Sequence, residues 1–162
     1  MRMPDDIASL AADTIAALKA KGMTIATAES CTGGLIAGAL TSISGSSDVV
    51  YGGFVTYANE AKIGMIGVPF GLLRQHGAVS EEVAIAMADG ALATAGTHVA
   101  VAVTGIAGPN GGSEEKPVGL VHFAVATEDG TTHRKNVFRG NRDEIRHASV
   151  VEALRLVLKA VG

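Results

Sequence analysis

Ser30 lies in a segment that could carry nucleophilic chemistry, Glu29-Ser30-Cys31-Thr32-Gly33-Gly34. The β-leaning stretch 23–28 precedes it and the helix-forming run 35–40 follows, so the hydroxyl is expected in a tight turn from strand to helix. Such a turn can expose a serine, while the backbone N–H groups of Gly33 and Gly34 hold an oxyanion or a phosphate. The alternative is structural, with Ser30 or Thr32 only capping the helix.

Cys31 is a rival nucleophile, because a thiol at a helix N-terminus can have a lowered pKa. Most lone cysteines are packing residues, however, and the sequence shows no His or Asn partner for this one. Cys31 is the one cysteine of the chain. An internal disulfide framework and a Cys-based metal cluster are therefore excluded, and a cytoplasmic location is expected.

A serine nucleophile needs a base, and Lys62 is the strongest candidate. It follows the expected strand 49–57 by a few residues. A lysine in a water-poor pocket can be neutral near pH 7 and take a hydroxyl proton, whereas a lysine near a helix start is usually solvated. The histidines have neither ligand-like nor triad-like spacing and are expected to be structural or surface residues; they are His76, His98, His122, His133 and His147.

The Gly-rich loop 104–117 resembles a phosphate cradle, but it does not match the known nucleotide motifs. It has no Gly-Lys-Ser/Thr after its glycines, and their spacing is not G-x-G-x-x-G. It is either a ligand-facing loop or a mobile connection. Arg142 and Arg146 share one face of the last helix and could bind a phosphate, although a solvated helix face explains them equally well.

The remaining pattern predicts the elements that position these residues. Helices are expected at 5–21, 35–40, from a cap at Asn59, at 71–75, from a cap at Ser80, and at 141–160. Strands are expected at 23–28, 49–57 and 99–104, followed by a hairpin of 118–127 and 132–138; glycines in 49–57 indicate close packing or a bulge. This order predicts a three-layer α/β/α fold whose mixed, mainly parallel sheet has one antiparallel strand. The ligand crevice should then lie at the carboxyl ends of the strands, between loops 29–34 and 104–117.

Length and composition narrow the classes of protein. The chain has 162 residues, which suits one domain over 1–162 with a real core. A net charge of −3, an aromatic fraction of 4% and the absence of Trp argue against a nucleic-acid-binding surface. The acidic start predicts no signal peptide, and Gly, Ser and Thr interrupt the uncharged stretches, so no membrane span is expected.

Several motifs occur together and in order over about residues 5–160. They are 27–34 (TAESCTGG), 53–62 (GFVTYANEAK), 76–80 (HGAVS), 104–109 (TGIAGP) and 111–119 (GGSEEKPVG). On these motifs the sequence closely resembles the CinA C-terminal domain family, and within it the stand-alone nicotinamide-nucleotide amidases. Longer relatives carry a further N-terminal, pyrophosphatase-like domain, whose activity is not expected here.

The resemblance implies hydrolysis of the carboxamide of nicotinamide mononucleotide to nicotinic acid mononucleotide and ammonia, without a metal or organic cofactor. It assigns the nucleophile to Ser30, the general base to Lys62 and assistance in proton transfer to Tyr57. It also implies oxyanion and substrate-binding roles for Thr32, Gly33, Gly34, Thr104, Gly105 and Arg142. Asn141 departs from the family, which often has Asp there. The implied partners are a small nucleotide substrate and further copies of the chain in a homo-oligomer.

Two other readings stay open at this point. The chain could be an amidase for another substrate, or a nucleotide-binding module that keeps the pocket without turnover. A pure binding module could lose either Ser30 or Lys62, and both are present. Their presence favours the enzyme.

Overall fold

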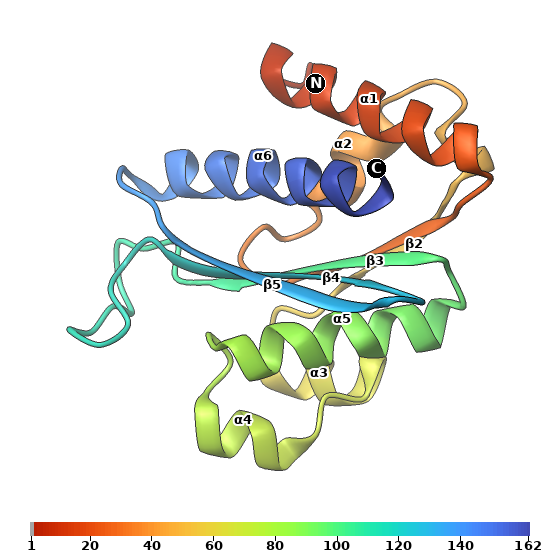
Figure 1. Ribbon diagram of the computed structural model, residues 1–162. Helices are drawn as coiled ribbons and strands as arrows, with labels where there is room; N and C mark the ends of the chain where they lie inside the picture. The colour runs from red at the N-terminus through yellow and green to blue at the C-terminus, as the bar shows by residue number, and fades with distance from the viewer. Residues whose placement is uncertain (1) are drawn as a thin grey trace.

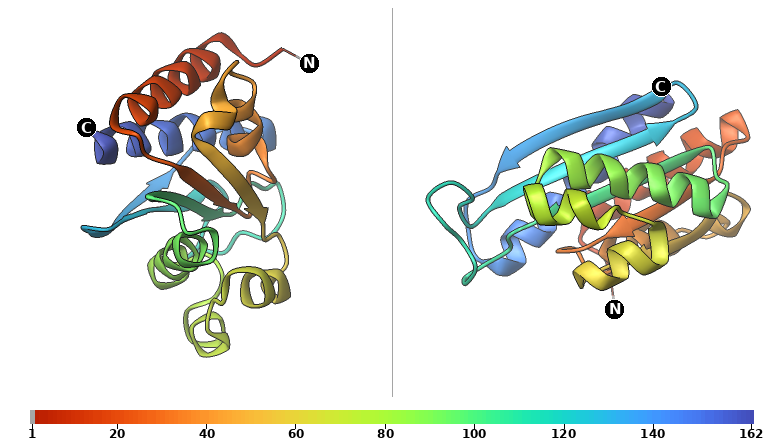
Figure 2. Two further views of the ribbon diagram at one scale, coloured as in Figure 1. Left: turned by 90° about the vertical axis from the view of Figure 1, so that its right-hand side faces the viewer. Right: turned by 90° about the horizontal axis from the view of Figure 1, so that it is seen from below.

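The computed structural model describes residues 2–162 and consists of one five-stranded sheet with helices packed on both faces (Figure 1). The strands are β1 (Ile25–Glu29), β2 (Val50–Val55), β3 (Val99–Gly105), β4 (Leu120–Thr127) and β5 (Gly130–Val137), in the spatial order β2-β1-β3-β4-β5. Helices α1 (Asp5–Lys21), α2 (Leu35–Thr41) and α6 (Arg142–Val161) cover one face. Helices α3 (Asn59–Ile66), α4 (Phe70–His76) and α5 (Glu81–Ala95) lie on the other, and the left view of Figure 2 shows the layers edge-on.

The strand directions confirm the predicted sheet. β1 is parallel to both β2 and β3, β4 is antiparallel to β3, and β5 is antiparallel to β4. Only β4 therefore runs against the other strands. The expected irregularity in β2 is also present, because the β1–β2 register shifts between Ile25 and Ala26 while Gly53 packs closely on Thr27.

The helix starts follow the capping rules in part. Ser80 caps α5, since its hydroxyl accepts a hydrogen bond from the Val83 N–H at 3.3 Å. The predicted cap at Asn59 is wrong: α3 begins at Asn59, the N-cap position is Ala58, and no side chain caps it. Asn141 caps α6 in a reciprocal capping box with Glu144, so an asparagine meets the needs of this helix start without an acid.

Two apolar cores separate the layers, one on each side of the sheet. β3 and β4 are buried along almost their whole length because helices cover both of their faces. Alternate β3 residues therefore enter opposite cores, with Val101 and Val103 facing α1 and α6, and Ala100 and Ala102 facing α5. Small alanines on the α5 side let that helix approach the sheet closely.

The edge at which β1, β2 and β3 end is where a ligand crevice is expected. These parallel strands bring Ser30, Thr56 and Thr104 to the same edge.

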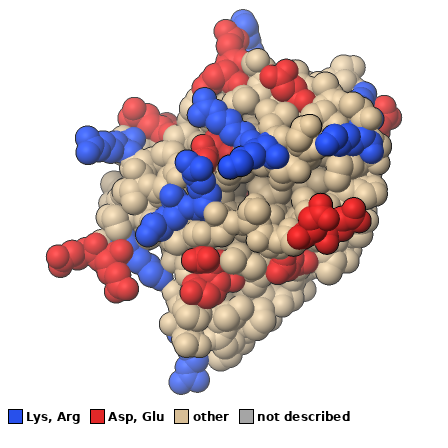
Figure 3. Space-filling model, in the orientation of Figure 1, with Lys and Arg blue, Asp and Glu red and all other residues tan. Residues whose placement is uncertain are grey.

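The surface of the molecule is mixed in charge: the face in Figure 3 carries both acidic and basic groups rather than basic ones alone. None of the helices formed by residues 2–162 combines the length and apolarity needed to cross a bilayer.

Candidate functional site

A cavity of about 270 Å³ opens at the carboxyl ends of β1 and β3. Three segments form most of its wall: the turn that follows β1, the start of α3 with the residues before it, and the first half of the 104–117 loop. Its lining includes Ser30, Cys31, Tyr57, Asn59, Lys62, Ala78, Val79, Thr104, Gly105, Ile106, Ala107, Gly108, Asn110, Gly111 and Arg142. The crevice expected between the two loops is therefore present, and the 104–117 loop faces it.

Ser30 and Lys62 meet in this cavity. The Lys62 amine (Nζ) lies 3.1 Å from the Ser30 hydroxyl oxygen (Oγ), although the residues are 32 positions apart in the chain. The backbone of Ser30 is fixed to β3, because its N–H donates to the carbonyl of Val103 at 3.0 Å. Lys62 is only 1% exposed. The solvated alternative for this lysine is therefore wrong.

The surroundings of Lys62 favour a neutral amine. Burial lowers its pKa from the usual 10.5, and none of the carboxylates in residues 2–162 forms an ion pair with it. Two backbone carbonyls accept from Nζ, that of Thr56 at 2.8 Å and that of Tyr57 at 3.2 Å. Nζ also donates to the Ser30 hydroxyl oxygen. Once the amine is neutral, its two N–H groups serve the carbonyls and its lone pair is left to accept from that hydroxyl.

Thr32, Gly33 and Gly34 lie outside the cavity lining. The N–H of Gly33 donates to the Ser30 carbonyl at 3.1 Å, and the hydroxyl of Thr32 donates to the Glu29 carboxylate at 2.7 Å. Both groups are thus engaged within the turn in this conformation rather than free for an oxyanion. The glycines are required by the backbone, since their φ values are 59° and 102°.

Tyr57, Arg142 and Thr104 all line the cavity; Tyr57 and Arg142 are exposed, whereas Thr104 is buried. The phenol of Tyr57 is close to Arg142, with Nη2 of the arginine 3.3 Å from the oxygen, and only the backbone carbonyl of Tyr57 contacts Lys62. Arg142 also donates to the Gly108 carbonyl at 2.8 Å. Thr104 donates to the Ala78 carbonyl at 2.9 Å, which ties the end of β3 to the loop before α5.

Cys31 is a poor rival to Ser30. Burial raises the pKa of its thiol to about 11, so the reactive thiolate is scarce at neutral pH. Arg146 does not join Arg142 at the cavity. Its guanidinium instead donates to the Cys31 carbonyl at 3.1 Å and to the Thr32 carbonyl at 3.4 Å. The two arginines therefore hold different loops.

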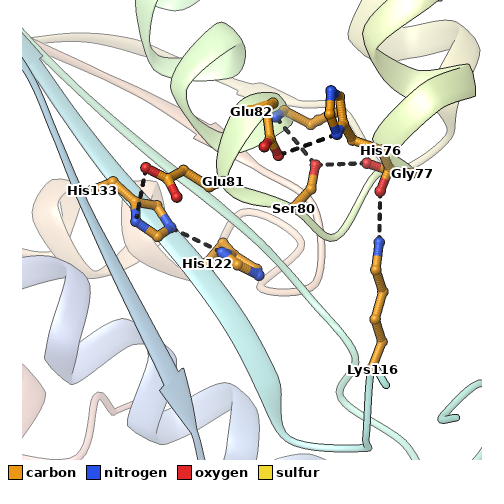
Figure 4. A network of polar contacts seen from close by, with 9 residues as sticks. His76, Gly77, Ser80, Glu81, Glu82, Lys116, His122 and His133 are labelled. Carbon is orange, nitrogen blue, oxygen red and sulfur yellow. Dashed lines mark hydrogen bonds and ion pairs between the residues drawn. The ribbon is translucent and has the colours of Figure 1, made fainter. Parts of the chain in front are cut away.

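None of the histidines lines this cavity. Figure 4 shows three of them, His76, His122 and His133, in polar contacts of their own. His122 and His133 share a hydrogen bond of 2.9 Å between their rings, and Glu81 lies 3.8 Å from the far nitrogen of His133. Burial lowers the pKa of His122 to about 4. Over residues 2–162, His, Cys, Asp and Glu side chains do not come together in threes that could hold a metal ion.

The sequence interpretation missed Glu29, whose side chain is completely buried beside Ser30. It also missed the carbonyl oxygens of Thr56 and Tyr57 as contacts of Lys62. One signal for Glu29 was available, because an acid directly after a buried strand has no solvent for its charge and must find internal donors. Backbone carbonyls leave no such mark in a sequence.

Comparison with known proteins agrees with this fold and these motifs. A family profile described as the CinA C-terminal domain matches residues 7–161. The chain belongs to the CinA C-terminal domain family. This CinA C-terminal domain is 56% identical over 140 residues to the nicotinamide-nucleotide amidohydrolase PncC of Escherichia coli (strain K12), covering 86% of the chain and 85% of that protein.

Longer relatives contain the same domain as one part. The CinA-like protein of Synechococcus sp. (strain RCC307) is 53% identical over 151 residues, which make up 92% of this chain and 36% of that protein. The chain thus spans about a third of the length of such relatives. The crystal structure of competence/damage inducible protein CihA from Agrobacterium tumefaciens has a TM-score of 0.95 and 52% identity, covering 99% of this chain and 98% of that one.

Proposed function

We propose that residues 1–162 form one amidase domain that hydrolyses the carboxamide of nicotinamide mononucleotide to nicotinic acid mononucleotide and ammonia. The single observation that carries the proposal is the contact of 3.1 Å between the Lys62 amine and the Ser30 hydroxyl inside a cavity. This amine is buried and forms no ion pair with a carboxylate of residues 2–162. The similarity to the E. coli protein named nicotinamide-nucleotide amidohydrolase supports the choice of substrate.

The reaction divides into two displacements, because an acyl-enzyme replaces one high barrier with two lower ones. In the first, Ser30 Oγ bonds to the carboxamide carbon while its proton passes to Lys62. The carbon–nitrogen bond then breaks, and Lys62 returns the proton to the departing nitrogen, which leaves as ammonia. In the second, Lys62 takes a proton from water, the hydroxide attacks the ester, and Ser30 recovers its proton as nicotinic acid mononucleotide departs.

Other cavity residues take supporting roles in this proposal. Thr104, Gly105 and Arg142 contact the substrate, and Arg142 offers a guanidinium suited to a phosphate. The carbonyl of Tyr57 orients the Lys62 amine, while the phenol of Tyr57, which lies near Arg142, assists proton transfer.

The turn after β1 has a separate part in the proposal. Thr32, Gly33 and Gly34 would serve an oxyanion only if the turn opened on substrate binding, since Gly33 and Thr32 are engaged within it. A homo-oligomer remains part of the proposal and is tested by analytical ultracentrifugation.

Ammonia release from nicotinamide mononucleotide tests the proposal directly. Ser30→Ala and Lys62→Met should each lower kcat at least about 1000-fold, because each removes a reacting group. The exposed Ser42 and Lys159 allow matched controls, and Ser42→Ala and Lys159→Met should retain the wild-type rate. Mass spectrometry of quenched reactions should find the acyl group on Ser30. Full activity of Ser30→Ala would contradict the nucleophile.

Two alternatives are outcomes of the same assay. A wild-type protein that binds nicotinamide mononucleotide without releasing ammonia would be a binding module. Release of ammonia only from a different carboxamide would identify an amidase with another substrate. Comparing nicotinamide mononucleotide with its riboside then measures how much the phosphate contributes to kcat/KM.

A further inference from the structure

Glu29 is an acidic residue in a place that normally excludes one. It ends β1, the strand at the centre of the three parallel strands, and its side chain is 0% exposed. Burying a carboxylate costs several kcal/mol unless hydrogen bonds replace its water. Because burying this carboxylate costs stability, the hydrogen bonds that it forms indicate its role.

The carboxylate of Glu29 accepts hydrogen bonds from both sides of the turn that follows it. One oxygen accepts from the Thr32 hydroxyl at 2.7 Å and from the Ile36 N–H at 2.9 Å. The other accepts from the Ala37 N–H at 3.0 Å and from the Thr27 hydroxyl at 3.4 Å. The N-cap residue of α2 is Gly34, which has no side chain to cap the helix. Glu29 therefore caps α2 from the preceding strand and closes the loop of chain that contains Ser30.

The backbone of Glu29 reaches the other half of the proposed dyad. Its carbonyl accepts from the Thr56 N–H at 2.9 Å, and the Thr56 carbonyl in turn accepts from Lys62 Nζ at 2.8 Å. One residue thus connects the turn that bears Ser30 with the backbone group that orients Lys62.

We propose that Glu29 is a positioning residue of the amidase: its buried carboxylate fixes the 30–34 turn so that the Ser30 hydroxyl meets the Lys62 amine. The inference rests on the proposed function. Glu29 does not line the cavity, so it acts on the reaction through Ser30 and not on the substrate. Loss of its carboxylate should lower kcat and leave KM nearly unchanged.

The test uses Glu29→Gln, which keeps the shape of the side chain but replaces one acceptor oxygen by a donor. We expect kcat to fall about 10- to 100-fold, as is typical for a misplacement of about 1 Å, with KM within about 3-fold of the wild type. Val157→Ala is the control for lost stability. Val157 is buried in α6, about 22 Å along the helix from Arg142, and its truncation should lower Tm without lowering kcat.

Amide hydrogen exchange gives a second readout that does not need turnover. Ile36 N–H and Ala37 N–H bond to different oxygens of Glu29, so in Glu29→Gln one of them loses its acceptor and faces an NH₂ donor. Exchange over residues 31–37 should therefore accelerate at least about 10-fold relative to Val157→Ala. If Glu29→Gln does not fold, Thr32→Val removes one of the same hydrogen bonds and should show both effects at about 3-fold.

The outcomes separate this inference from the proposed function. A wild type without ammonia release contradicts the amidase, and the exchange experiment still decides whether Glu29 holds the turn. Unchanged exchange over 31–37 overturns the positioning role. Wild-type kcat in folded Glu29→Gln also overturns it, as does a loss of kcat no greater than in Val157→Ala at an equal fall in Tm.

Discussion

Gly90 offers a prediction in which tertiary packing reverses the sign expected from helix propensity. Replacing a glycine by alanine within a helix normally stabilises it by about 1 kcal/mol. At Gly90 in α5, however, an added Cβ would overlap the carbonyl oxygen of Ile66 and lie 3.0 Å from its carbon. Ile66 is the last residue of α3, and its carbonyl group would have to move away from Gly90 by about 1 Å.

The clash should outweigh the gain in propensity. Overpacking costs about 1–3 kcal/mol, and a backbone group has less freedom to move than a side chain, so the upper value applies. The net result for Gly90→Ala is a loss of about 2 kcal/mol, or a fall in Tm of about 4–8 °C for a chain of this length. Because α3 carries Lys62, its shift by about 1 Å should also lower kcat up to about 100-fold.

Gly64 provides the matched control. It lies in α3 and is exposed, and an added Cβ there meets nothing within 4 Å. Gly64→Ala should therefore raise the free energy of unfolding by about 1 kcal/mol and leave kcat unchanged. Thermal unfolding and ammonia release measured on both variants test the reasoning. A Gly90→Ala protein as stable as Gly64→Ala would refute it.

Three further predictions concern titratable groups. Since burial lowers the pKa of Lys62 from 10.5 and the base must be neutral, kcat/KM should rise with pH along one acidic limb; a flat profile down to acid pH would count against the base. The Cys31 thiol, with a pKa of about 11, should react with iodoacetamide at pH 8 about 100-fold more slowly than a free cysteine, and rapid alkylation of the folded protein would disprove its burial. Burial lowers the pKa of His122 to about 4, against 6.5 in an unfolded chain. The contribution of His122 to the free energy of unfolding is therefore complete above about pH 6.5 and is lost as the pH falls towards 4. Urea unfolding should show a loss of about 2 kcal/mol between pH 7 and pH 5 that is missing in His122→Gln; equal losses in both proteins would exclude His122 as the cause.

Local patterns were sufficient to predict most of the fold. Apolar periodicity located α1, α6 and the buried β3, and the Ser80 cap located the start of α5, because each signal lies within a few residues of the element it specifies. Asn59 failed as a cap since asparagine also occurs within helices, and no neighbouring residue distinguishes the two positions. The mainly parallel character of the sheet followed from the alternation of strands and helices, whereas its strand order came only from the structure.

Residue types and motifs were enough to show which groups could react, but the folding of the chain governs which of them meet. Ser30 and Lys62 could be chosen from residue type and from the family motifs, but their contact depends on β1 and β2 lying side by side in parallel. Glu29 and Arg146 acquire their roles through groups that no local pattern reveals, buried amides in one case and turn carbonyls in the other. The desolvation that lowers the pKa of Lys62 likewise arises only when helix, strand and loop close around it, because burial is a property of the assembled chain and not of any segment.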